Sequence, residues 1–188
     1  YQSTVKAFEK IGLKNARKMY SKSGQKKIFD QLETGQISGE KFILEIQKII
    51  PNATKSSIIK SWNAIIKDLP SSRLKILQKL KKDFKIFLLS NTNQIHIDHI
   101  INKLGKEKYK MFYNLFDKVY FSHEVKLRKP DYNIFKLVIN ENDLEIKKTL
   151  FIDDSIQHIN SARKIGLHTF HLDEKKESLE TIFPGIVQ

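Results

Sequence analysis

Three short segments of the sequence carry side chains suited to phosphate and metal chemistry. Ser90 follows the apolar run Phe-Leu-Leu, and Lys129 lies directly before a proline. Asp153 and Asp154 follow the apolar run Leu-Phe-Ile. A hydroxyl and an ammonium group bind anions, whereas adjacent carboxylates attract a cation. Together these residue types predict a site that binds a phosphate group beside a metal ion.

The pair Asp153 and Asp154 is the strongest of these signals. Two neighbouring carboxylates at the end of a buried strand repel each other, and burying them is costly without a cation. Mg²⁺ usually takes one or two protein carboxylates and leaves its other positions to water and phosphate. The pair therefore predicts a Mg²⁺ site. The alternative is that Asp154 or Ser155 caps the helix that follows.

The other candidates each have an ordinary structural alternative. Ser90 and Asn91 precede an expected helix, where hydroxyl and backbone N–H donors form an anion site, but a serine there can also simply cap the helix. Lys129 can meet phosphate as a point charge or can be one more surface lysine. His158 lies one helical turn after Asp154 and either orients that carboxylate or its water, or packs inside the domain.

Alternating strands and helices after residue 70 are expected to position these residues. The apolar runs predict strands at 84–89, 118–121, 149–152 and 168–171, with helices between them. This alternation is typical of parallel β-α units, and the apolar character of the strands predicts a sheet covered on both faces. Ligands bind such sheets at the carboxyl ends of the strands, where the three polar segments are expected.

Residues 1–69 show no strand pattern and are expected to be helical. Ser38 is a candidate helix N-cap, and the helix after it has an apolar stripe of Phe42, Ile43, Ile46, Ile49 and Ile50. The break at Leu69–Pro70 predicts a small helical domain over 1–69 and an α/β domain over 70–188.

Composition limits the classes of protein that fit. The chain has 188 residues, of which 40% are apolar, so it can bury a core. It has no cysteine, which excludes disulfides and thiolate catalysis and fits a cytoplasmic protein. No apolar run approaches the ~20 residues of a membrane span, so no membrane partner is expected. The net charge of +13 comes from scattered lysines, which favours a solvated exterior over a nucleic-acid surface.

Read in order, Leu-Leu-Ser90-Asn91-Thr, Arg-Lys129-Pro-Asp and Phe-Ile-Asp153-Asp154-Ser resemble the second, third and fourth motifs of the haloacid dehalogenase superfamily. The helical segment before them resembles the helical cap of a subfamily that includes sugar-phosphate phosphatases, β-phosphoglucomutase-like proteins and the phosphatase domains of epoxide hydrolases. The resemblance implies a three-layer, Rossmann-like α/β core with a small all-helical cap.

The same resemblance implies a Mg²⁺-dependent phosphatase that acts on a small phosphorylated metabolite, such as a sugar phosphate, through an aspartyl-phosphate. Ser90, Asn91 and Lys129 would bind the phosphoryl group. Asp154 would ligate Mg²⁺, and Asp153 would be a second ligand or would orient a metal-bound water. Lys129 is expected to act on this chemistry and not on folding.

Two departures from the family pattern leave alternatives open. The first motif, Asp-x-Asp at the end of a central strand, does not occur in residues 1–188, so the resemblance places the nucleophile and that strand upstream. Residues 1–188 alone are then expected to be inactive and to leave two unpaired strand edges. The family's fourth motif often has Asn where this chain has His158. A metal-independent 2-haloacid dehalogenase and a non-catalytic binding protein are the alternatives. The sequence predicts no oligomeric state.

Overall fold

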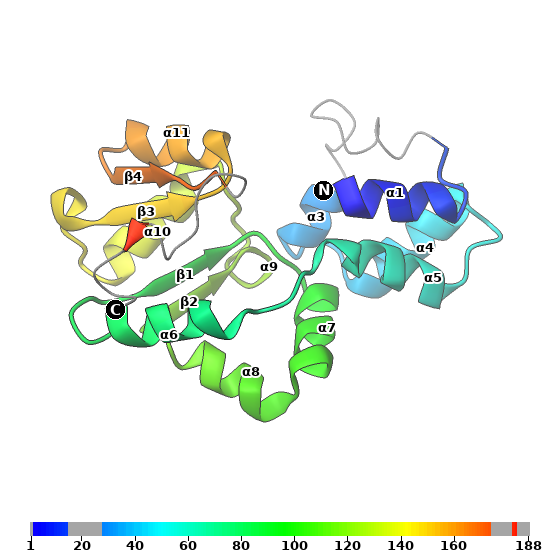
Figure 1. The fold of residues 1–188 in the computed structure, drawn as a ribbon. Coiled ribbons are helices and arrows are strands. Elements are labelled where there is room, and N and C mark those ends of the chain that lie inside the picture. Colours follow the sequence, from blue (N-terminus) through cyan, green and yellow to red (C-terminus); the bar gives the residue numbers. More distant parts are fainter. Residues whose placement is uncertain (1, 15–27, 174–181, 184–188) are drawn as a thin grey trace. The chain divides into compact units, whose positions relative to one another are not determined.

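A computed structural model of the chain describes residues 2–14, 28–173 and 182–183 (Figure 1). The chain divides into two compact units. The first unit consists of Tyr1–Asp68, Ser90–Tyr113 and Phe121–Lys126, and the second consists of Leu69–Leu89, Asn114–Tyr120 and Leu127–Gln188. The predicted division at residues 69 and 70 into a cap and a core stays a prediction, because segments from both sides of it share the first unit.

The first unit is helical. Its helices are α1 (Gln2–Lys10), α3 (Ile28–Glu33), α4 (Gly39–Ile49), α5 (Lys55–Trp62), the 3₁₀-helix η1 (Asn63–Ile65), α7 (Gln94–Leu104), α8 (Lys106–Tyr113) and α9 (Ser122–Val125). Ser38 caps α4 as predicted, since its hydroxyl accepts a hydrogen bond from the Lys41 N–H at 3.1 Å. Thr54 caps α5 in the same way, accepting from the Ser57 N–H.

Trp62 lies at the centre of the first unit's core. Its side chain is 3% exposed, its ring stacks on Phe29 at 5.3 Å, and Phe42 packs against it at 5.0 Å. The α4 stripe faces this cluster except for Ile49, which is 52% exposed, contrary to the sequence prediction. Ile49 lies at the edge of the stripe in the last turn of α4, and Ile50 is buried instead. Large aromatic side chains therefore hold the helices together.

A buried polar network joins the end of α5 to the start of α7. The Trp62 indole N–H donates to Asn93 Oδ1 at 3.2 Å, and Asn93 caps α7 by accepting from the His96 N–H. His96 Nδ1 lies 2.8 Å from Asn63 Oδ1, and its ring stacks on Trp62. Burial lowers the pKa of His96 to about 4, with a smaller effect from the charge of His99. His96 is therefore neutral in the folded protein at neutral pH.

This network predicts a loss of stability in mild acid. His96 titrates near its usual pKa of about 6.5 when unfolded but near 4 when folded, so the unfolded state binds the proton first as the pH falls. The free energy of unfolding should fall by up to about 3 kcal/mol between pH 6.5 and 4. Urea unfolding at several pH values measures this slope. His96→Asn keeps a donor toward Asn63 and should flatten the slope; an unchanged slope would contradict the assignment.

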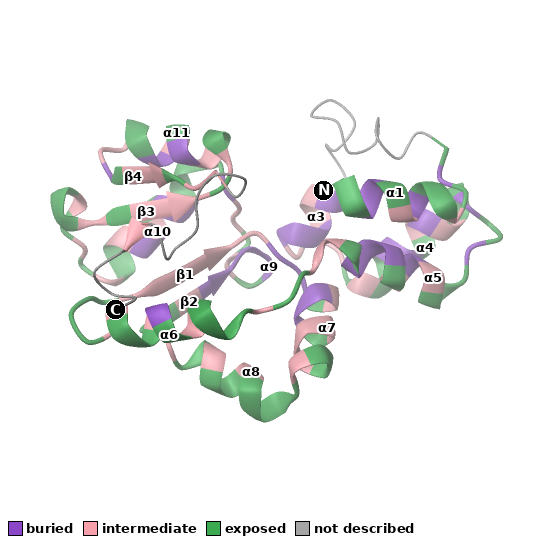
Figure 2. Ribbon diagram, viewed as in Figure 1, coloured by how far each residue is buried: buried purple, intermediate pink, exposed green. Residues whose placement is uncertain are grey.

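The second unit contains the strands. They are β1 (Phe87–Ser90), β2 (Lys118–Phe121), β3 (Leu150–Asp153) and β4 (His168–His171), with Ser90 and Phe121 counted in the first unit. The helices are α6 (Ser71–Leu80), α10 (Tyr132–Glu141), the 3₁₀-helix η2 (Ile146–Lys148) and α11 (Ile156–Lys164). Figure 2 shows that α10 and α11 both have buried segments. Ile134 and Phe135 of α10 and Ile159 of α11 are buried there.

The strands form two separate pairs. β1 pairs with β2, and β3 pairs with β4 in parallel, with Leu150 opposite His168 and Asp153 opposite His171. Within the described residues, no strand joins the two pairs. All four residues of β1 are only partly buried, and Leu150 of β3 is 49% exposed. The expected coverage of these strands is therefore incomplete, because a strand with one neighbour leaves its other edge and flanking side chains open.

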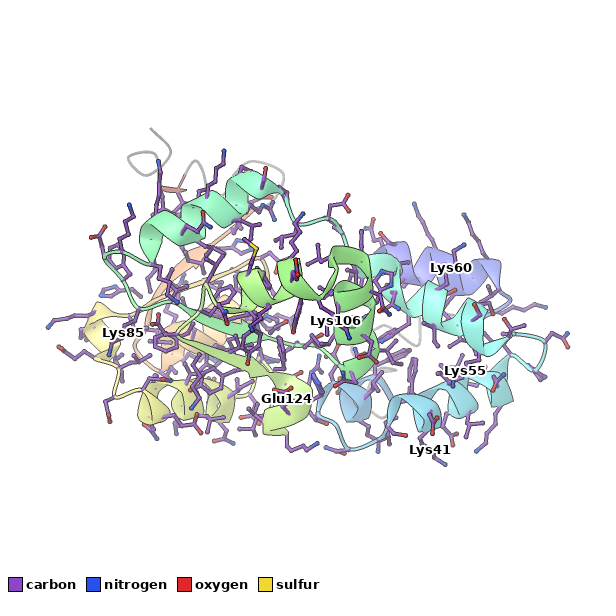
Figure 3. The ribbon with its side chains drawn as sticks, turned by 90° about the horizontal axis from the view of Figure 1, so that it is seen from below. Lys41, Lys55, Lys60, Lys85, Lys106 and Glu124 are labelled. Atoms are coloured by element: carbon purple, nitrogen blue, oxygen red, sulfur yellow. The ribbon has the colours of Figure 1, made fainter. Side chains whose placement is uncertain are left out.

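The lysines lie on the outside of many elements. Figure 3 shows the side chains of Lys41, Lys55 and Lys60 projecting from α4 and α5, and all three are exposed. This distribution is typical of a solvated helical exterior. Among the described residues, no helix combines the length and the apolar character that crossing a membrane requires.

Candidate active site

Asp153 ends β3 with a side chain that is 7% exposed and bound on both oxygens. Its Oδ2 accepts a hydrogen bond from Lys129 Nζ at 2.7 Å. Its Oδ1 accepts from the Ser155 N–H at 2.8 Å and lies 2.9 Å from His158 Nδ1. Three donors from two parts of the chain, the loop before α10 and the start of α11, therefore converge on one carboxylate.

This environment keeps Asp153 ionised. Burial acts to raise the pKa of its carboxyl group, but the hydrogen bond with His158 and the charge and hydrogen bond of Lys129 outweigh it. The Ser155 N–H adds to the same effect, and the pKa lies well below its usual range. Asp153 is thus an acceptor for hydrogen bonds throughout the neutral pH range.

Lys129 is buried in the loop between α9 and α10. Its side chain is 8% exposed, and Nζ donates to the backbone carbonyl of Leu89 in β1 at 2.8 Å as well as to Asp153. The ammonium also lies 5.6 Å from the centre of the Phe151 ring. Lys129 therefore links the ends of β1 and β3, and it is not one of the surface lysines. Its catalytic role stays a prediction.

Asp154 differs from its neighbour because it is exposed. His171 Nε2 lies 3.1 Å from its backbone oxygen, but its carboxylate has no hydrogen bond to another described residue. Asp154 does not cap α11: Ser155 occupies the cap position without a side-chain hydrogen bond, and Asp153 binds the Ser155 N–H. A carboxylate without such a partner, beside an ionised one, suits a hard cation.

The donor set fits Mg²⁺ in particular. The described residues contain no group of three or more His, Cys, Asp or Glu side chains that could hold a metal ion. Mg²⁺ accepts one or two carboxylates with water and phosphate in its other positions. Asp154 would hold it, and Asp153 is already occupied by Lys129.

Ser90 and Asn91 belong to the first unit. Ser90 ends β1 and comes directly after Leu89, the residue whose backbone carbonyl accepts from Lys129. The cap of α7 is Asn93, so the alternative that Ser90 caps this helix is wrong. Thr92 is fixed by Ser122: the Thr92 N–H donates to Ser122 Oγ at 2.9 Å, and Ser122 Oγ donates back to the Thr92 carbonyl at 3.0 Å. No sequence pattern indicates this role for Ser122. Phosphate binding by Ser90 and Asn91 stays a prediction.

Comparison with known proteins assigns the family. The haloacid dehalogenase-like hydrolase family matches residues 2–172. The chain belongs to this family. The predicted family, its α/β fold and the prediction of an enzyme are thereby confirmed. The match spans both compact units and all three motifs that the sequence analysis identified.

Individual relatives agree with this assignment. The chain is 28% identical to a D-ribitol-5-phosphate phosphatase from Bacteroides thetaiotaomicron, over 88% of this chain and 81% of the relative. It is also similar to a family enzyme from that organism whose wild-type crystal structure contains magnesium and inorganic phosphate, with a TM-score of 0.80, 30% identity and coverage of 97% and 90% of the two chains. A predicted hydrolase from Porphyromonas gingivalis shares the fold, with a TM-score of 0.83, 24% identity and coverage of 100% and 90%.

Proposed function

We propose that this protein is a Mg²⁺-dependent phosphatase that hydrolyses the phosphate monoester of a small polyol or sugar. The observation that carries the proposal is the end of β3, where Lys129 binds Asp153 and leaves the neighbouring Asp154 carboxylate exposed. A buried ammonium beside an exposed carboxylate offers charge to a phosphoryl group and a ligand to its metal. The relative that acts on D-ribitol 5-phosphate and the neighbour with magnesium and phosphate support both parts.

Each residue has a distinct task in this proposal. Asp154 holds Mg²⁺, which supplies positive charge that offsets the charge of the phosphoryl oxygens when it is bound. Lys129 directs its ammonium at the same oxygens, and its contacts with Leu89 and Asp153 fix it before substrate arrives. The Ser90 hydroxyl and the Asn91 segment donate hydrogen bonds to the phosphoryl group. The nucleophile that the family uses, an aspartate of the first motif, is not among residues 1–188.

The exposed Asp154 carboxylate also distinguishes the proposal from the family alternative. A 2-haloacid dehalogenase needs no metal, so nothing in its chemistry requires a second carboxylate next to the one that binds the lysine. Mg²⁺ chemistry does require such a ligand. The geometry therefore favours phosphate ester hydrolysis.

Phosphate release by the full-length protein tests the proposal. The substrates are D-ribitol 5-phosphate, other five- and six-carbon sugar phosphates and a generic aryl phosphate, each with Mg²⁺ and after chelation. We expect Mg²⁺-dependent release, fastest with a sugar or polyol phosphate, and a loss of ~100-fold or more in Ser90→Ala, as for removal of one transition-state donor. Release that survives chelation, or halide release from a 2-haloacid in place of phosphate release, would refute the proposal.

A further inference from the structure

His158 makes a contact that the proposed chemistry does not use. It lies in the first turn of α11, its side chain is 18% exposed, and Nδ1 is 2.9 Å from Asp153 Oδ1. The carboxylate of Asp153 accepts from Lys129 Nζ on Oδ2 and from the Ser155 N–H on Oδ1, and a carboxylate paired with a lysine in this way has no hydrogen to donate. The hydrogen in this contact therefore belongs to His158 Nδ1.

The two oxygens of Asp153 have separate partners. Oδ1 accepts from Ser155 and His158, whereas Oδ2 accepts only from Lys129 among the hydrogen bonds of the described residues. Rotation of the carboxylate about its Cβ–Cγ bond would break the bonds to Oδ1. The donors on Oδ1 therefore fix the orientation of the carboxylate. This orientation determines where Oδ2 accepts the hydrogen bond from Lys129 Nζ.

We propose that His158 is a positioning residue for Lys129 and acts through Asp153. Its Nδ1–H fixes the carboxylate so that Oδ2 holds the Lys129 ammonium at the ends of β1 and β3. His158 thus serves the phosphate-binding lysine and does not orient Asp154 or its metal. This inference rests on the proposed function, in which Lys129 faces the transferring phosphoryl group.

A matched pair of substitutions separates the hydrogen bond from the bulk of the ring. In asparagine, Nδ2 is bonded to Cγ just as Nδ1 is in histidine, so His158→Asn retains a donor close to the same place. In His158→Leu, a methyl group takes that place and no donor remains. The two new side chains have the same number of heavy atoms and the same branching at Cγ, and both lose the same part of the imidazole ring. A difference between them therefore reports the hydrogen bond.

Kinetics of the full-length protein with Mg²⁺ provide the first measurement. We expect His158→Leu to lower kcat by roughly 10-fold, at the lower end of the ~10–100-fold losses seen for residues that support a first ligand. KM should change much less, because the bond serves the transition-state charge. His158→Asn should recover most of the loss. Equal kcat values in the two variants, or a loss in His158→Leu that appears only as a lower melting temperature, would overturn the inference.

A second measurement does not depend on turnover. The buried, doubly hydrogen-bonded ammonium of Lys129 should give a slowly exchanging ¹⁵N–¹H signal, identified by its loss in Lys129→Arg. We expect this signal in the wild type and in His158→Asn, and its broadening or shift in His158→Leu. An unchanged signal in His158→Leu would overturn the positioning role even if the phosphatase activity is confirmed. If the ¹⁵N–¹H signal changes among the variants as expected but the wild type has no phosphatase activity, the proposed function is refuted instead.

Discussion

Lys129→Ala should lower the turnover of a phosphate monoester by ~100-fold or more at saturating Mg²⁺. The substitution removes a buried positive charge that is fixed by Leu89 and Asp153, and one such preorganised donor typically contributes ~10²–10³ in kcat. Steady-state phosphate release, corrected for the folded fraction, measures the effect. Lys129→Arg restores a positive charge opposite Asp153, but its planar guanidinium group differs in shape from the compact ammonium of lysine. The substitution should therefore recover the lost stability more than the lost turnover.

The Lys129 variants should also unfold more easily, which corrects the expectation that this lysine acts only on chemistry. Lys129 and Asp153 form a buried ion pair, and breaking such a pair leaves an uncompensated charge that costs about 3–5 kcal/mol. Thermal unfolding measures this cost. If Lys129→Ala lowers only the melting temperature and leaves kcat of the folded fraction unchanged, the catalytic role is wrong.

The control for general loss of basic charge is a lysine with no structural contact of this kind. Lys126 lies only three residues before Lys129, but its Nζ donates to the carbonyls of His123 at 2.9 Å and Gly35 at 3.1 Å, so Lys126→Ala should lower stability. Lys136 on α10 is exposed and is the better control. Lys136→Ala should leave kcat within about 2-fold of wild type, as for most surface substitutions.

Asp154→Asn should weaken Mg²⁺ binding more than any other single substitution in the described site. It removes the charge of the carboxylate that is exposed and free of other hydrogen-bond partners among the described residues, and Mg²⁺ depends on such hard, charged ligands. We expect the dissociation constant for Mg²⁺, measured by calorimetry, to rise by ~100-fold or more, beyond the ~10–100-fold that supporting residues contribute.

The neighbouring residue provides the matched control. Asp153→Asn removes one charge from the same strand end, but its carboxylate is bound by Lys129, Ser155 and His158. It should affect Mg²⁺ affinity less than Asp154→Asn does and should lower stability more. Equal effects of the two substitutions on metal binding would show that Asp153 is also a direct ligand. Negligible effects of both would remove the metal site from this strand end.

The strongly patterned elements were predictable from the sequence. The strand 118–121 and the strand 168–171 have the predicted bounds. α8 was not predicted because it has no buried residue, and a helix without a buried face has no apolar period to detect. The exposure of Ile49 and the division of the strands into two pairs depend on contacts between residues far apart in the sequence. The local periodicity of apolar residues carries no information about such contacts.

The site was predictable in its residue types but not in its pairing. The apolar run before Asp153 and Asp154 indicated two carboxylates at a strand end, but only the three-dimensional contacts show that one binds Lys129 and the other stays exposed. The contribution of Leu89 is a backbone carbonyl, which no residue type reveals. His158 was noted for its distance from Asp154, yet its partner is Asp153, because the ring points back along the first turn of α11.

A crystal structure of the full-length protein with Mg²⁺ and inorganic phosphate tests the central claim most directly. We expect Mg²⁺ on the carboxylate of Asp154, phosphate within hydrogen-bonding distance of Lys129 Nζ and the Ser90 hydroxyl, and Asp153 still bound to Lys129 through Oδ2. Mg²⁺ bound away from Asp154, or phosphate bound away from Lys129 Nζ, would contradict the proposed function.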